Sequence, residues 1–135
     1  MLGALCAGLL LNGCATTPVP TSEAADVPVA RVLNGALLVR RADTGAVVVK
    51  RDAGIMASAC TTRIFVDGMP IADIATGEKV TLHLTEGAHM LAGRANGVCI
   101  GGLVETSVVV VKGRLSAVRI SYGSSGEFSI QPTAF

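Results

Sequence analysis

The chain has 135 residues, the size of a single ordinary domain. Half of the residues are hydrophobic, yet only 3% are aromatic and there is no Trp. Eleven Lys and Arg residues face ten Asp and Glu residues, which excludes a protein that binds nucleic acid through net charge, because no basic excess can displace counterions from phosphates. High apolar content with low net charge also argues against disorder.

The N-terminal segment is uncharged and apolar. Glu23 is the first charged residue, and residues 2–11 form an apolar run. A bilayer-spanning helix needs about 20 residues, so this run matches the hydrophobic region of a signal peptide. An ordinary buried helix is the alternative, and the Gly-Cys-Ala-Thr-Thr-Pro sequence that follows at once argues against it. A signal peptide has Lys or Arg before its hydrophobic region. None precedes the run here, and a start codon further upstream would explain the difference.

The apolar run ends in Leu11-Asn12-Gly13-Cys14. Here the chain resembles a bacterial lipoprotein precursor, whose motif reads Leu, a small or polar residue, Gly or Ala, then Cys. The resemblance implies that residues 1–13 are a signal peptide and that Cys14 is acylated, with palmitate among its chains. Three acyl chains exceed the two signals that durable anchoring in a lipid bilayer requires.

The residue after the predicted lipidation site bears on location. In Gram-negative lipoproteins an Asp at that place commonly favours retention in the inner membrane, and this chain has Ala15. The resemblance therefore implies an outer-membrane lipoprotein facing the periplasm, or a cell-membrane lipoprotein in an organism with one membrane. We expect residues 14–29, with three prolines, to be a flexible tether that holds a domain of residues 30–135 a few tens of Å from the bilayer, at about 3.1 Å per residue.

Four cysteines are present: Cys6, Cys14, Cys60 and Cys99. Removal of the signal peptide and acylation of Cys14 would leave Cys60 and Cys99 as a pair in an oxidising compartment, so we expect a disulfide between them. There is no CxxC motif, and two Cys with two scattered His residues lack zinc-site spacing. Nothing in the sequence places a histidine base beside either thiol.

From residue 30 onward the sequence predicts strands. Residues 79–85 alternate strictly between apolar and polar side chains, and residues 116–122 and 128–131 do the same. Unbroken valine runs at residues 47–49 and 108–111 predict strands that are covered on both faces. Glycines punctuate the chain at intervals of about ten residues. We therefore expect an all-β fold, a small antiparallel β-sandwich or open barrel of about seven to nine strands.

Three turns are predicted between these strands. Residues 42–45 separate two apolar segments and indicate a hairpin. Asp67-Gly68 and Glu86-Gly87 are each expected to form a tight hairpin corner with positive φ. These residues shape the backbone, and their presence does not argue for chemistry.

Residues 64–72 read Ile-Phe-Val-Asp-Gly-Met-Pro-Ile-Ala. This segment resembles the opening of PEGA-type and related small envelope β-domains, which read hydrophobic-x-Val-Asp-Gly-x-x-hydrophobic-Ala/Gly. Residues 85–89 then fall where such domains have Pro-Glu-Gly-Ala, with Thr85 replacing Pro. The resemblance covers residues 64–92. It implies a fold found as an add-on module in cell-envelope proteins, including many lipoproteins, and it implies no activity.

Candidates for chemistry are few. Asp67 and Asp73 are interpreted as solvated loop carboxylates. His83 is expected to be exposed on the polar face of its strand, and His89 to cap a hairpin through a backbone hydrogen bond. The sequence thus predicts no catalytic residue, no metal site and no cofactor.

Residues 93–102 are rich in glycine but lack the Lys-Ser/Thr ending and the following helix of a phosphate-binding loop. We expect a long loop attached to the domain through Cys99. If a surface patch binds a partner, Arg94 and Asn96 in this possible binding loop are the first choice, because loops on a rigid scaffold commonly carry binding.

These observations favour a non-enzymatic structural or protein-interaction module of the cell envelope that docks on another envelope protein. The alternative is a module that binds a glycan or small ligand of the cell wall. Sugar binding usually uses exposed aromatic rings, and this chain has only Phe65, Tyr122, Phe128 and Phe135. We expect Phe65 and Phe128 to lie in the core, which argues against the alternative.

Overall fold

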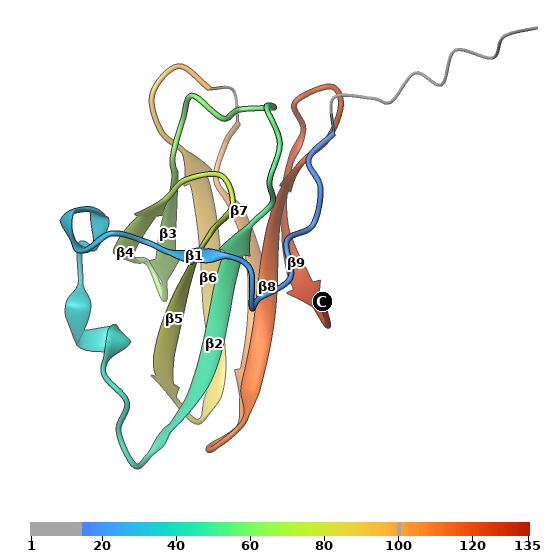
Figure 1. Cartoon of the computed structure of the whole chain (residues 1–135). Coiled ribbons are helices and arrows are strands. Elements are labelled where there is room, and N and C mark those ends of the chain that lie inside the picture. The colour runs from blue at the N-terminus through green and yellow to red at the C-terminus, as the bar shows by residue number, and fades with distance from the viewer. Residues whose placement is uncertain (1–14, 100) are drawn as a thin grey trace, which may run out of the picture.

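The computed structural model describes residues 15–99 and 101–135 as two β-sheets packed face to face (Figure 1). One sheet has five strands in the order β1-β5-β2-β8-β9, and the other has four in the order β4-β3-β6-β7. The predicted all-β sandwich is therefore confirmed. The strands are β1 (Ala25–Asp26), β2 (Thr44–Arg51), β3 (Thr62–Val66), β4 (Met69–Ile74), β5 (Glu78–Thr85), β6 (Gly87–Ala95), β7 (Val104–Val110), β8 (Leu115–Tyr122) and β9 (Phe128–Thr133).

Two short 3₁₀ segments, η1 (Val29–Arg31) and η2 (Gly35–Leu38), precede β2. No helix within the described residues is long and apolar enough to cross a membrane.

The five-stranded sheet contains two parallel pairs. Strand β2 pairs antiparallel with β5 but parallel with β8, and β1 runs parallel to β5. The sandwich is therefore not wholly antiparallel. All strands of the four-stranded sheet lie between β2 and β8 in the sequence. The β2–β8 pair therefore joins segments that are far apart along the chain.

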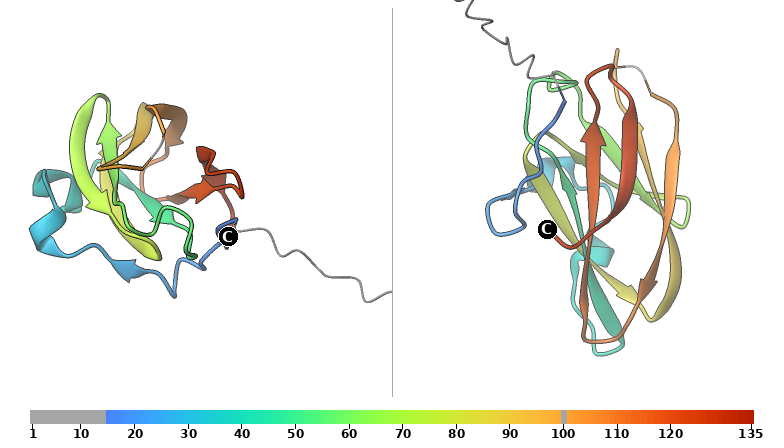
Figure 2. Two further views of the ribbon diagram at one scale, coloured as in Figure 1. Left: turned by 90° about the horizontal axis from the view of Figure 1, so that it is seen from above. Right: turned by 90° about the vertical axis from the view of Figure 1, so that its right-hand side faces the viewer.

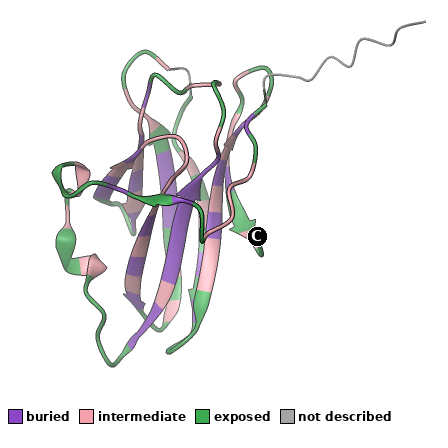
Figure 3. Ribbon diagram, viewed as in Figure 1, coloured by how far each residue is buried: buried purple, intermediate pink, exposed green. Residues whose placement is uncertain are grey.

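The predicted alternation of side chains is confirmed in β5, β8 and β9. In β5, Val80, Leu82 and Leu84 point into the core and are at most 2% exposed, while the side chains between them lie on the outer face. Figure 3 shows this banding of buried and more exposed residues along the strands. The core lies between the two sheets and includes Val47, Val49, Ile64, Val66, Ile71, Ile74, Val80, Leu82, Leu84, Leu91, Val118, Ile120, Tyr122 and Ile130.

The two valine runs differ in burial. Val47, Val48 and Val49 in the central strand β2 are at most 3% exposed, as predicted for a strand covered on both faces. In β7, however, Val109 is 70% exposed. Strand β7 lies at the edge of its sheet and alternates between core and solvent, so the prediction for the second run was wrong.

The predicted turns have different outcomes. Asp67 and Gly68 have φ values of 49° and 83° and connect β3 to β4 as the expected hairpin. Gly87 also has positive φ, but it connects β5 to β6, which belong to different sheets. It therefore forms a corner between the sheets and not a hairpin. Residues 42–45 form no hairpin either, because η2 and an irregular segment precede β2.

From Thr16 onward, the segment before residue 30, expected to be a flexible tether, lies against the domain (Figure 2). The Thr16 N–H donates to the Tyr122 carbonyl at 2.9 Å, and Thr17 exchanges two backbone hydrogen bonds with Ala53. Further along, β1 pairs with β5, and Val27 is buried. The folded domain thus extends to Thr16, and the expected spacing of tens of Å does not exist after that residue.

Candidate functional site

The outer face of the five-stranded sheet carries a groove of about 590 Å³. Its floor consists of polar and aliphatic side chains from the middle of the sheet. Basic residues from the segment before β2 form one rim, and basic residues from the β7–β8 turn form the other. We call this the basic groove; its lining includes Arg40, Arg41, Thr44, Ala46, Val48, Thr81, His83, Lys112, Arg114 and Leu115.

The charge of the basic groove is unbalanced. No Asp or Glu lines it. The Arg41 Nε lies 3.9 Å from the Asp43 Oδ1, and both of these side chains are at least half exposed. Within the described part of the chain, Arg40, Lys112 and Arg114 form no ion pair. Four permanent cations around one concave surface create a positive potential that favours an anionic ligand, although the whole chain is nearly neutral.

Thr44 joins the two rims of the basic groove. Its hydroxyl donates to the Arg41 carbonyl at 2.8 Å and accepts from the Arg41 N–H at 3.2 Å. Its own carbonyl accepts from the Gly113 N–H at 3.2 Å. The parallel register, which pairs Ala46 with Leu115, then brings the two rims together.

Sequence reasoning missed the basic groove. The Arg40-Arg41 pair and the Lys-Gly-Arg turn at residues 112–114 are ordinary solvated charges when read separately. Only the parallel pairing of β2 with β8 makes them neighbours, and hydrophobic alternation does not reveal a parallel partner. His83 lies on the outer face of β5, as predicted, but it is half-buried on the floor of the groove and not exposed.

The predicted disulfide between Cys60 and Cys99 is confirmed. It joins the β2–β3 loop to the β6–β7 loop. Arg51 at the end of β2 also holds the β2–β3 loop. Its side chain is 1% exposed and donates hydrogen bonds to the carbonyls of Cys60 at 2.5 Å and Ala57 at 2.6 Å. Burial lowers the pKa of Arg51 from its ordinary value.

Arg94 and Asn96 do not form the expected binding loop. Arg94 lies in β6, where its guanidinium carbon is 5.7 Å from the centre of the Phe65 ring. Asn96 uses its amide within the domain, donating at 2.9 Å to Thr61 Oγ1 and to Asp73 Oδ1. The glycine-rich stretch is strand only as far as Ala95, and the loop begins at Asn96. Phe65 lies on the outer face of the four-stranded sheet and not in the core as expected.

The two candidate carboxylates are not alike. Asp73 lies in β4 and accepts from Arg63 Nε and Nη2, both at 2.9 Å, and these bonds lower its pKa. The interpretation of Asp73 as a solvated loop residue was therefore wrong. Asp67 lies in the β3–β4 turn, half exposed, and its Oδ2 is 2.6 Å from His89 Nδ1. His89 Nε2 also contacts the Thr85 carbonyl, which is a backbone contact of the kind predicted.

Cys14, the predicted lipidation site, lies outside the described residues. Among residues 15–99 and 101–135, no group of three or more His, Cys, Asp or Glu side chains is arranged to bind a metal ion. No protein-family model, curated protein or solved structure matches this chain.

Proposed function

We propose that this protein is a lipoprotein of the bacterial cell envelope, anchored through Cys14 in the outer membrane and facing the periplasm, and that it acts as a non-enzymatic protein-interaction module. In this proposal the basic groove binds an acidic surface of another envelope protein. The observation that carries it is the position of the groove relative to the anchor. Thr16 is bound at the end where β2 and β8 finish, and the groove lies where these two strands begin.

Covalent geometry supports this arrangement. Only Ala15 separates Cys14 from Thr16, so the Cα atoms of Cys14 and Thr16 lie at most about 7 Å apart. Strand β2 has eight residues, which corresponds to a length of about 27 Å. A lipid on Cys14 would therefore keep one end of the sandwich at the membrane and present the basic groove on the side away from it.

The chemistry of the basic groove favours a protein partner over a glycan. No Phe, Tyr or Trp lines it, so it lacks the large aromatic rings on which sugars usually stack. Its cations instead match Asp and Glu side chains, which they would attract over a distance of about 8 Å at physiological ionic strength. The Asp67-Gly68 hairpin is compatible with the PEGA-type resemblance, which we retain as part of the proposal.

Metabolic labelling with a palmitate analogue tests the anchor. We expect label on the wild-type protein and on the C6S variant, because Cys6 would be removed with the signal peptide. The C14S variant should carry no label and should partition into the aqueous phase of a detergent split. Label on C14S, or none on the wild-type protein, would contradict the anchor.

Crosslinking in intact cells followed by mass spectrometry tests the groove. We expect a dominant protein partner that is lost in the R40E/R114E variant and retained in R94E, which reverses an exposed charge on the other sheet. Capture should also weaken as the salt concentration rises. A partner that R40E/R114E still captures would contradict the role of the groove, and retention on purified peptidoglycan would favour the cell-wall alternative.

A further inference from the structure

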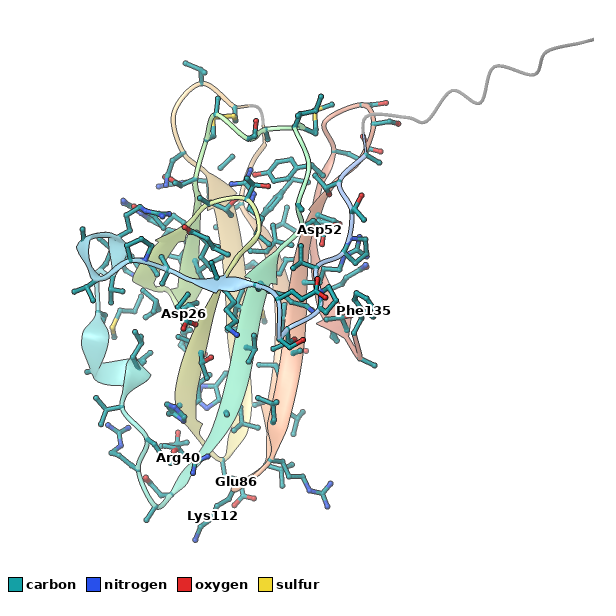
Figure 4. All side chains as sticks on the ribbon, viewed as in Figure 1. Asp26, Arg40, Asp52, Glu86, Lys112 and Phe135 are labelled. Atoms are coloured by element: carbon teal, nitrogen blue, oxygen red, sulfur yellow. A yellow bond between two sulfur atoms is a disulfide. The ribbon has the colours of Figure 1, made fainter. Side chains whose placement is uncertain are left out.

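The two ends of the sandwich differ sharply in charge. The β2–β3, β4–β5, β6–β7 and β8–β9 loops lie together at one end, which we call the loop end (Figure 1). Their residues 52–61, 75–77, 96–103 and 123–127 include two charged residues, Glu127 and Asp52, and the Asp52 side chain is buried. The opposite end carries Arg40, Glu86 and Lys112, as Figure 4 shows, together with the rest of the basic groove.

The loop end also exposes apolar side chains. Ile55 in the β2–β3 loop is 80% exposed, and Val98 in the β6–β7 loop is 94% exposed. Both lie in the two loops that the disulfide joins, and Val98 is next to Cys99. Beside them lies a concave surface of about 620 Å³ whose lining includes Met56 and Phe128. Water therefore contacts a largely uncharged, partly apolar surface at this end.

The chain leaves the domain from among these same loops. Thr16 forms a backbone hydrogen bond with Tyr122, the residue directly before the β8–β9 loop, and Thr17 forms two with Ala53 in the β2–β3 loop. Thr16 is also buried, and its hydroxyl donates to the buried carboxylate of Asp52 at 3.0 Å. This attachment leaves only Ala15 between the domain and Cys14.

We propose that the loop end rests on the bilayer that holds the acylated Cys14, with the side chains of Ile55 and Val98 inserted among the lipid headgroups. This inference rests on the proposed lipid anchor. The short connection confines the loop end to the membrane surface at a high effective concentration. An apolar side chain gains free energy on leaving water, and the near absence of charged groups at the loop end avoids their desolvation.

The absence of Trp from the chain permits a direct test. The acylated, processed V98W variant is reconstituted into vesicles of phosphatidylethanolamine and phosphatidylglycerol that contain a brominated phospholipid as a quencher. Compared with the same variant in vesicles without the brominated lipid, we expect its tryptophan emission to lose most of its intensity. Compared with the protein in detergent-free buffer, the emission maximum should shift to shorter wavelength. The matched control is V109W, at a residue that is 70% exposed in β7 near the opposite end, and its emission should keep its intensity.

Vesicle flotation separates the failure of this inference from the failure of the anchor. If V98W floats with the vesicles but is not quenched, or if V109W is quenched as strongly, the orientation is wrong and the anchor stands. If the wild-type protein does not float with the vesicles at all, the anchor itself fails. The I55W variant should behave like V98W, so a local effect of one substitution cannot decide the result.

Discussion

Asp52 and Arg119 form a two-pronged ion pair that connects the ends of the parallel strands β2 and β8. Arg119 Nε and Nη2 each donate to the Asp52 carboxylate at 2.7 Å, and the Asp52 side chain is only 1% exposed. The Thr16 hydroxyl donates to the same carboxylate. The hydrogen bonds with Asp52 raise the pKa of Arg119. One buried carboxylate therefore joins the sheet to the segment that leads to Cys14.

Loss of Arg119 should be strongly destabilising. In R119M the buried Asp52 carboxylate loses its cationic partner, and removal of one member of a buried ion pair costs about 3–5 kcal/mol. Urea unfolding followed by circular dichroism measures this free energy. Limited proteolysis should also cut faster near Thr16, because the carboxylate that binds its hydroxyl is no longer fixed in position.

The double variant D52N/R119M provides the control for this pair. It removes both charges, so it should recover part of the stability that R119M loses. The single variant D52N is measured as well. If the loss of unfolding free energy in D52N/R119M equals the sum of the losses in D52N and R119M, the two residues do not interact, and the assignment of the pair is wrong.

Arg51 should be as sensitive to replacement, for a different reason. Its guanidinium carbon lies 5.0 Å from the centre of the Tyr122 ring, and it donates to three carbonyls, two of them in the β2–β3 loop. Replacement of a buried charge by an apolar residue is often neutral when nothing polar remains. Here R51M leaves buried acceptors behind, so we expect a loss of about 2–4 kcal/mol.

The measurement for Arg51 is again urea unfolding, with hydrogen exchange to locate the effect. The exchange protection of the β2–β3 loop should fall more than that of β5. Equal loss of protection throughout the sheet would contradict a role specific to this loop. R63M, which removes a half-buried Arg on the other sheet, is the matched control for loss of a guanidinium.

The alternation of apolar side chains was sufficient to predict the inner faces of β5, β8 and β9, because burial on one face of a strand leaves a period of two in the sequence. It could not separate the valine run of β2 from that of β7. The two runs have the same composition, and only the position of a strand at the centre or edge of its sheet decides whether its outer face is covered. Sheet order is a tertiary property, so it was not available from the sequence.

The candidate site was less predictable than the fold. The pairing of Cys60 with Cys99 followed from cysteine parity, once Cys6 was assigned to a signal peptide and Cys14 to acylation. The basic groove depends on the β2–β8 register, and the attachment of Thr16 depends on a carboxylate 36 residues away. Prolines in the predicted tether favour extended backbone, but extended backbone also suits a segment that lies against a sheet, so composition could not distinguish the two.

The disulfide should contribute a large share of the stability. Its cysteines are 39 residues apart, and closing a loop of that length stabilises the fold by about 4 kcal/mol through the entropy of the unfolded chain. Unfolding with and without a reducing agent measures the difference. The C60A/C99A variant should match the reduced wild-type protein, and an unchanged midpoint after reduction would contradict the prediction.

Stability should also fall as the pH rises above about 6.5, because of His89. Burial lowers its pKa, but the hydrogen bonds to Asp67 and Thr85 outweigh this, so the pKa is raised from its ordinary value of 6.5. Both ring nitrogens face acceptors at 2.6 and 2.7 Å, and only the protonated ring can donate to both.

The sign of this effect follows from linkage. A raised pKa stabilises the folded state fully below about pH 6.5, and the contribution is lost as the pH rises through the folded-state pKa. The hydrogen bond from the Met90 N–H and that from His89 lower the pKa of Asp67, so its own contribution is lost only in acid, below about pH 4. Because the Asp67 side chain is 53% exposed, we expect the His89 effect to stay below about 1 kcal/mol. Urea midpoints between pH 5 and 9 should therefore fall for the wild-type protein and flatten in H89Q. A fall that persists unchanged in H89Q would assign the effect to another group.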